Sequence, residues 1–207
     1  MNLHRLVDKS DWATTNPKDY NAAQKIAAST KGIITPGNIA TLIGFLIVLY
    51  GLFMLIKQEL LLGAAALAIG RIFDILDGAI ADITKTKNNI GEFFDATIDK
   101  ISTLLTIGVI FATQANLWLM LALLILPHVF ISLIVVYKRS KGQKLHPTRI
   151  GKISMALAWV AILGLVISPL ITTHWSQLFA AIVYMILFTS SLLGFYAAWQ
   201  YLQERAK

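Results

Sequence analysis

Residues 70–100, GRIFDILDGAIADITKTKNNIGEFFDATIDK, carry acidic residues at helical spacing between apolar ones. The first group of small and acidic residues recurs at intervals of three and four: Asp74, Asp77, Gly78 and Ala81. A second group recurs at intervals of four: Gly91, Asp95 and Asp99. Each group therefore shares one face of a helix. The short connection predicts an antiparallel helix pair in which the four aspartates converge.

The rest of the chain is unusually apolar. Of its 207 residues, 57% are hydrophobic and 14% are charged, which is typical of a polytopic membrane protein. Six stretches are long enough to cross a bilayer: 34–57, 59–84, 91–113, 116–138, 150–171 and 175–202. We therefore expect an all-α integral membrane protein with six transmembrane helices in one catalytic domain, residues 34–203, followed by a short cytoplasmic tail, residues 204–207.

The N-terminal segment, residues 1–33, is polar and lacks the apolar core of a secretory signal. Its part KDYNAAQKIAASTKG, residues 18–32, suits a helix lying in the membrane interface, and an ordinary polar lead-in explains it equally well. Lysine and arginine gather in alternate connections and at both ends of the chain. Because cytoplasmic loops retain positive charge, we expect both termini and the aspartates to face the cytoplasm, in the cell membrane.

The formal net charge is +7 and the chain has no cysteine. The basic residues lie between apolar segments, where they would meet anionic lipid headgroups or phosphorylated substrates, so nucleic acid is not the expected partner. The lack of cysteine excludes disulfides, thiolate metal sites and cysteine nucleophiles. Any chemistry must therefore rest on other side chains.

Carboxylates inside a membrane are costly and require a partner or a function. A cluster of four at low dielectric needs positive charge among its members. Ligands that are all oxygen select hard cations such as Mg²⁺, Mn²⁺ or Ca²⁺, and two such ions would leave places for substrate phosphates. An aspartate outside full coordination could then deprotonate an attacking hydroxyl. The residues thus indicate phosphoryl-transfer chemistry.

The spacing DxxDGxxA, then nine residues, then GxxxDxxxD resembles the signature of the CDP-alcohol phosphotransferases. Members of this family are six-span membrane enzymes that join a CDP-activated lipid or alcohol to an alcohol acceptor and release CMP. The resemblance implies phospholipid biosynthesis from a donor such as CDP-diacylglycerol, among membrane lipids. By family analogy it also implies a homodimer.

Carried over position by position, the resemblance implies that Asp74, Asp77 and Asp95 bind two Mg²⁺ or Mn²⁺ ions. It implies that Asp99 is the general base, with metal contact as an additional role. Small residues would line the nucleotide pocket: Gly78, Ala81 and Gly91. Close helix packing is an equally good explanation of these three residues.

The segment TPGNIAT, residues 35–41, resembles the family's PNxxT element near the nucleotide, although Gly37 separates Pro36 from Asn38. This weaker match would place Asn38 and Thr41 beside the nucleotide, and helix capping is the alternative. One position departs from the family pattern, which has an arginine after the alanine where this chain has Asp82. Asp82 could add a metal ligand, pair with a lysine of the following loop, or mark an unusual substrate.

Four basic residues on the predicted side of the aspartates could bind a phosphate on the acceptor: Lys138, Arg139, Arg149 and Lys152. A solvated positive-inside loop explains them as well. The run DATIDKI, residues 95–101, resembles phosphatidylglycerophosphate synthases, as does Gly151 with Lys152, without the following threonine. Glycerol 3-phosphate is therefore the first expected acceptor and inositol phosphate the second, with serine or another lipid behind them.

A small cation transporter with a carboxylate ion site is the rival class. Two features of the sequence count against it. The aspartates gather near one membrane face, and no second half of the chain mirrors the first three spans.

Overall fold

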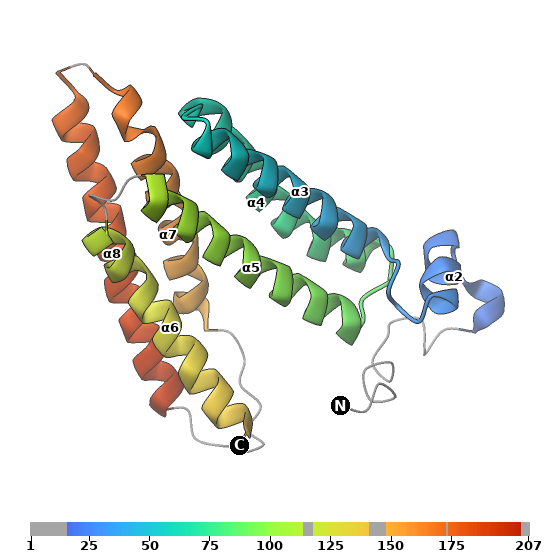
Figure 1. The fold of residues 1–207 in the computed structure, drawn as a ribbon. Helices are drawn as coiled ribbons and strands as arrows, with labels where there is room; N and C mark the ends of the chain where they lie inside the picture. Colours follow the sequence, from blue (N-terminus) through green and yellow to red (C-terminus); the bar gives the residue numbers. More distant parts are fainter. Residues whose placement is uncertain (1–15, 114–117, 141–147, 173, 204–207) are drawn as a thin grey trace. The chain divides into compact units, whose positions relative to one another are not determined.

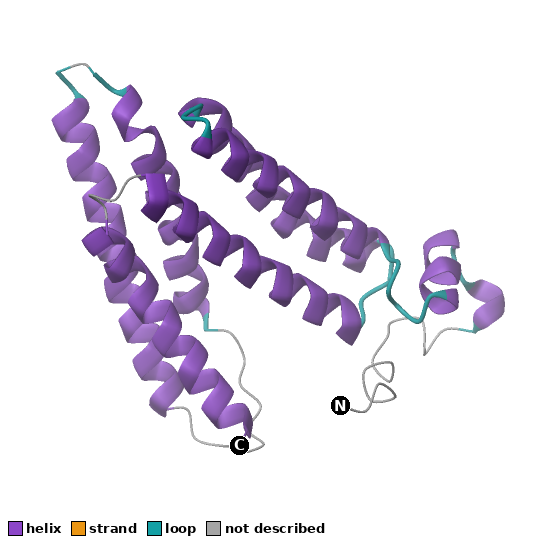
Figure 2. Ribbon diagram, in the orientation of Figure 1, coloured by secondary structure: helices purple, strands orange, loops and turns teal. Residues whose placement is uncertain are grey.

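The computed structural model describes residues 16–113, 118–140, 148–172 and 174–203, which form helices and no strand (Figures 1 and 2). Two short helices come first, η2 (Pro17–Asp19) and α2 (Ala22–Ser29). The long helices are α3 (Pro36–Ile56), α4 (Leu60–Ile83), α5 (Asn89–Thr113), α6 (Trp118–Ser140), α7 (Arg149–Ile167) and α8 (Ser176–Gln203), with η4 (Ser168–Leu170) after α7. The chain divides into two compact units, Met1–Val109 and Ile110–Lys207.

Each predicted span corresponds to one long helix, with bounds that differ by a few residues. Among the described residues, however, only four helices are long and apolar enough to cross a membrane: α3, α5, α7 with η4, and α8. Helix α4 carries Arg71, Asp74 and Asp77 along its second half, and the apolar stretch of α6, Ala122–Lys138, is shorter. The structure thus supports a membrane protein, and the six-span topology stays a prediction.

Helices α3 and α4 pack closely because glycines lie in their contact surface. The glycines of α3 recur at intervals of seven positions: Gly37, Gly44 and Gly51. A Cβ atom on Gly44 would lie 3.3 Å from the carbonyl oxygen of Gly70 in α4. One on Gly37 would lie 3.1 Å from the carbonyl oxygen of Asp77. The missing side chains allow the two backbones to approach, which sets the first turns of α3 against the aspartates of α4.

Helix α2 lies within the segment for which an interfacial helix was one of two explanations. Asn21 and Gln24 form a capping box at its start, with the backbone N–H of Gln24 donating to Asn21 Oδ1 at 2.7 Å. The side chain of Asn21 also donates to the carbonyl oxygen of Thr84 (3.1 Å), and that of Gln24 to the carbonyl oxygen of Lys85 (3.4 Å). These bonds tie α2 to the loop that follows α4.

The second unit contains α6, α7 and α8. Ser154 of α7 and Ser190 of α8 exchange hydrogen bonds, each hydroxyl donating to the other's carbonyl oxygen at 2.9 and 2.8 Å. Pro127 lies inside α6, and a Cβ on Gly194 of α8 would lie 2.7 Å from its Cβ. Small residues and reciprocal hydroxyl bonds thus hold this unit together. The predicted tail, residues 204–207, lies outside the described residues, and the predicted domain boundaries stay predictions.

Candidate functional site

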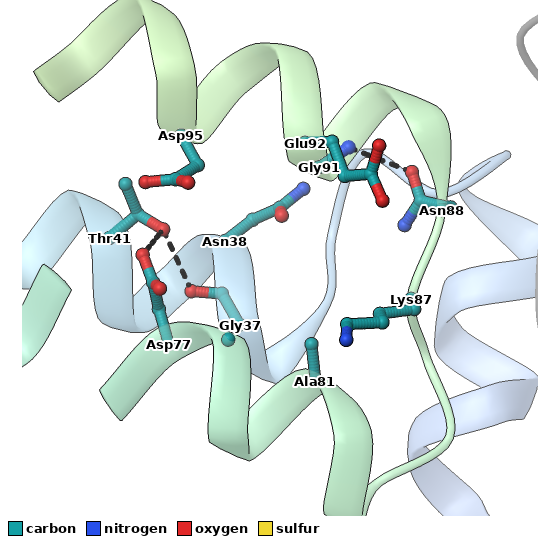
Figure 3. Close-up of a pocket in the computed structure, with 11 residues that line it drawn as sticks. Gly37, Asn38, Thr41, Asp77, Ala81, Lys87, Asn88, Gly91, Glu92 and Asp95 are labelled. Atoms are coloured by element: carbon teal, nitrogen blue, oxygen red, sulfur yellow. Dashed lines mark hydrogen bonds between the residues drawn. The ribbon is translucent and has the colours of Figure 1, made fainter. Parts of the chain in front are cut away.

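The structure brings part of the signature into one pocket between α3, α4 and α5 of the first unit (Figure 3). We call it the aspartate pocket, and its lining residues are Gly37, Asn38, Thr41, Asp77, Gly78, Ala81, Lys87, Asn88, Gly91, Glu92 and Asp95. All five residues predicted to contact the nucleotide line this pocket: Asn38, Thr41, Gly78, Ala81 and Gly91. Two of the four aspartates, Asp77 and Asp95, line it as well.

Asp77 is the most enclosed of these carboxylates, with 5% of its surface exposed. The hydroxyl of Thr41 lies 2.5 Å from its Oδ2 and 3.1 Å from the carbonyl oxygen of Gly37 (Figure 3). A buried carboxylate requires such a donor. Thr41 therefore orients Asp77, a role that the sequence did not reveal, and its contact with the nucleotide stays a prediction.

Arg71 is the residue that sequence reasoning missed. Its Nη2 lies 3.1 Å from Asp74 Oδ2, three residues along α4, and its Nη1 donates a hydrogen bond to Asp99 Oδ1 on α5. The side chains are largely shielded, with 19–25% of their surface exposed. The signal was present, because Arg71 is a charged residue within an apolar stretch and three positions before Asp74.

The four aspartates are therefore divided rather than gathered at one point. Asp77 and Asp95 line the aspartate pocket, while Asp74 and Arg71 line a neighbouring cavity and Asp99 pairs with Arg71. Among the described residues no group of three or more acidic or histidine side chains is arranged to hold a metal ion.

The donor chemistry nevertheless suits hard divalent cations, since every candidate ligand offers carboxylate oxygen. Asp77 and Asp95 line one pocket, and Arg71 contacts both Asp74 and Asp99, so the four carboxylates form two neighbouring pairs. Within the described part of the chain no side chain donates to Asp95, whereas Arg71 contacts Asp74 and Asp99 and Thr41 donates to Asp77. Binding of divalent metal by Asp74, Asp77, Asp95 and Asp99 stays a prediction.

Asn38 and Gly91 fit each other across the pocket. The side-chain N–H groups of Asn38 donate to the carbonyl oxygens of Gly32 (3.2 Å) and Ile33 (2.9 Å). A Cβ on Gly91 would lie 2.8 Å from Asn38 Oδ1, which is too close. Asn88 accepts a hydrogen bond from the backbone N–H of Gly91 at 2.8 Å (Figure 3). Close approach of Asn38 thus accounts for glycine at position 91.

Gly78 differs from Gly91, because a Cβ on Gly78 would meet no atom within 4 Å. Packing between helices therefore does not account for glycine at this position, and open space in the pocket adjoins it. Ala81 does pack, since its Cβ faces Gly37 of α3. The two explanations offered by the sequence, packing and ligand access, thus separate residue by residue.

Asp82 forms an ion pair with Lys87, whose Nζ lies 2.7 Å from Asp82 Oδ1. Of the three roles left open for Asp82, this is the pairing with a lysine of the following loop. Lys87 and Ala81 both line the aspartate pocket (Figure 3).

The basic residues predicted to bind the acceptor belong to the second unit. Lys138 donates to the carbonyl oxygen of Leu202 at 3.1 Å, close to the end of α8. Arg149 and Lys152 lie in the first turn of α7, and the side chain of Arg139 lies outside the described residues. Their contact with substrate stays a prediction.

Comparison with known proteins identifies the family of this chain. The family model described as CDP-alcohol phosphatidyltransferase matches residues 34–193. The chain is 37% identical over 87 residues to an archaetidylinositol phosphate synthase of Pyrococcus horikoshii, which covers 42% of this chain and 46% of that protein. It is 30% identical over 139 residues to an uncharacterized protein of Aquifex aeolicus, covering 65% of this chain and 69% of that protein.

The chain thus spans about half the length of the first of these relatives. No solved structure matches it. The matched region contains α3, α4 and α5, which carry both halves of the signature and the aspartate pocket. The family match covers well over half of the chain, and the chain therefore belongs to the CDP-alcohol phosphatidyltransferase family.

Proposed function

We propose that the chain transfers a phosphatidyl-type group from a CDP-linked lipid to the hydroxyl of a small alcohol and releases CMP. The observation that carries the proposal is the aspartate pocket, in which the signature residues of two helices meet. In the reaction, the acceptor oxygen forms a bond to the lipid-linked phosphorus. The bond from that phosphorus to the oxygen of CMP breaks.

In this proposal Asp99 takes the proton of the acceptor hydroxyl, and its ion pair with Arg71 fixes the position of its carboxylate. Asp74, Asp77 and Asp95 would hold two Mg²⁺ or Mn²⁺ ions, which would neutralise the diphosphate and the leaving group. Thr41 would keep Asp77 oriented toward the pocket. The nucleotide would occupy the pocket beside Gly78, where the structure leaves open space.

We expect a phosphorylated polyol as the acceptor. The run DATIDKI favours glycerol 3-phosphate, and the relative named archaetidylinositol phosphate synthase favours inositol phosphate. Lys138, Arg139, Arg149 and Lys152 are the candidates for binding the acceptor's phosphate. Serine or another lipid is a weaker candidate, because neither is a phosphorylated polyol whose phosphate these basic side chains could bind.

The rival reading, a cation transporter, is less well supported because the chain belongs to a transferase family. We further propose that the enzyme is a homodimer in the cell membrane and that each chain crosses the membrane six times. Both termini and the aspartates would face the cytoplasm. The positive loops support this orientation.

The test uses the purified full chain in detergent with CDP-diacylglycerol, or its ether-linked counterpart, and Mg²⁺ or Mn²⁺. Glycerol 3-phosphate, inositol phosphate, inositol and serine are supplied separately, and CMP release is followed. We expect release that requires one phosphorylated polyol. Fast release with inositol or serine and none with either phosphate ester would contradict the acceptor assignment.

A further inference from the structure

Lys87 lies on the loop between α4 and α5, and hydrogen bonds on both sides of it fix this loop. The backbone N–H of Thr86 donates to the carbonyl oxygen of Ala81 at 2.9 Å. The side chain of Asn88 donates to the carbonyl oxygen of Thr86 at 3.1 Å. Thr86 and Asn88 are buried, with 1% and 5% of their surface exposed, whereas 45% of the Lys87 side chain is exposed. The loop therefore buries both neighbours and leaves the Lys87 side chain partly exposed.

The ion pair with Asp82 gives this exposed side chain a direction. Nζ of Lys87 lies 2.7 Å from Oδ1 of Asp82, and 60% of the Asp82 side chain is exposed. An exposed pair of this kind contributes only about 0–1 kcal/mol to stability. The pair therefore adds little stability, but it fixes the position of the ammonium group of Lys87, a residue that lines the aspartate pocket.

The charges around the pocket make this ammonium group distinctive. Three lining residues are acidic: Asp77, Glu92 and Asp95. Among the described residues that line the pocket, Lys87 is the one cation. Lys87, Ala81 and Gly78 line the same pocket, and a Cβ on Gly78 would meet no atom within 4 Å. An anionic ligand in this space would be repelled by the carboxylates and attracted by Lys87.

We propose that Lys87 binds a phosphate group of the CDP moiety and that Asp82 positions it. The inference rests on the proposed function and identifies which residue recognises the donor. The related family signature has an arginine at the position of Asp82. In this chain Asp82 instead pairs with Lys87, five positions later, and Lys87 lines the pocket.

The test compares Lys87→Gln with Lys85→Gln in the purified full chain. Lys85 lies on the same loop and is exposed, but it does not line the pocket. The measurements are KM for CDP-diacylglycerol, kcat, and inhibition by added CMP. Because a charge-assisted hydrogen bond is lost, Lys87→Gln should raise KM by about 10-fold or more and weaken CMP inhibition similarly. Lys85→Gln should match the unmodified protein.

Two further variants separate binding from structure. Lys87→Arg keeps the positive charge and should retain a near-normal KM. Asp82→Arg combined with Lys87→Gln places an arginine where the family pattern has one, and it should recover part of the lost affinity for CMP. If the ion pair had only a structural role, the double variant would not recover affinity for CMP, because it cannot form the pair.

Two results would overturn the inference, and they are distinguishable. If the unmodified protein releases CMP but Lys87→Gln and Lys85→Gln have the same KM and the same CMP inhibition, Lys87 does not recognise the donor and the proposed function stands. If the unmodified protein neither releases CMP nor binds it in equilibrium dialysis, the proposed function fails and the role of Lys87 fails with it.

Discussion

Arg71 links α4 to α5 by donating a hydrogen bond to Asp99, and the same guanidinium group contacts Asp74 at 3.1 Å. A planar guanidinium can serve two carboxylates at once, which a lysine ammonium does less well. Arg71 thus supplies the positive charge that a cluster of carboxylates requires at low dielectric. It also fixes the residue proposed as the general base.

Replacing Arg71 with methionine should destabilise the protein, because Asp74 and Asp99 would lose their shared counter-charge. We expect a loss of about 1–3 kcal/mol, less than a fully buried pair would give, since these side chains are partly exposed. Thermal unfolding in detergent measures the loss. Added Mg²⁺ or Mn²⁺ should restore part of it if these carboxylates bind metal.

The control is Arg71→Lys, which keeps the charge but not the forked geometry and should be less destabilised. If Arg71→Met and the unmodified protein had the same unfolding temperature, the ion pairs of Arg71 would not contribute to stability.

Replacing Thr41 with valine should impair the site through Asp77. Valine has nearly the same shape but no hydroxyl, so the buried carboxylate would lose its donor, at a cost of about 1–3 kcal/mol. We expect lower kcat and a higher metal concentration for half-maximal activity. Thr41→Ser keeps the hydroxyl and serves as the control. Equal metal dependence in the valine and serine variants would show that Thr41 does not orient Asp77.

Gly78 and Gly108 offer a matched pair for the nucleotide pocket. A Cβ on either would meet no atom within 4 Å, but only Gly78 lines the aspartate pocket. Because alanine favours helix over glycine, by about 1 kcal/mol, neither substitution should destabilise the protein. Gly78→Ala should raise KM for the CDP-lipid, whereas Gly108→Ala should not. An unchanged KM in Gly78→Ala would place the nucleotide elsewhere.

The orientation can be tested by labelling single cysteines, since the chain has no natural cysteine. Lys57→Cys lies after α3 and Lys85→Cys lies after α4. In intact cells a membrane-impermeant maleimide should label position 57 and not position 85. After permeabilisation both should react. Labelling of position 85 in intact cells would reverse the predicted orientation.

The helices and the faces that carry the aspartates could be predicted from sequence because helical period and apolar length are local properties. The pairing of Asp82 with a loop lysine was one of three options, and only the fold of residues 84–88 decides among them. The bonds from Thr41 to Asp77 and from Arg71 to Asp99 join residues 36 and 28 positions apart. Such contacts depend on how helices pack, which periodicity alone does not specify.

Polar residues also explain why the span prediction was only partly supported. Helix α4 is long, yet its site residues Arg71, Asp74 and Asp77 make it too polar to qualify as a span by composition. A functional site within a membrane helix therefore weakens the same apolar signal by which the helix is recognised.

In the proposed reaction an acceptor hydroxyl attacks a CDP-linked lipid at the aspartates and releases CMP. The most direct measurement is CMP release, with and without acceptor, by the unmodified protein and by Asp99→Asn. Loss of a general base should lower acceptor-dependent release by about 100-fold or more, with little change in the binding of CMP. Full activity of Asp99→Asn would contradict the role of Asp99, and no CMP release from the unmodified protein with any acceptor would contradict the account as a whole.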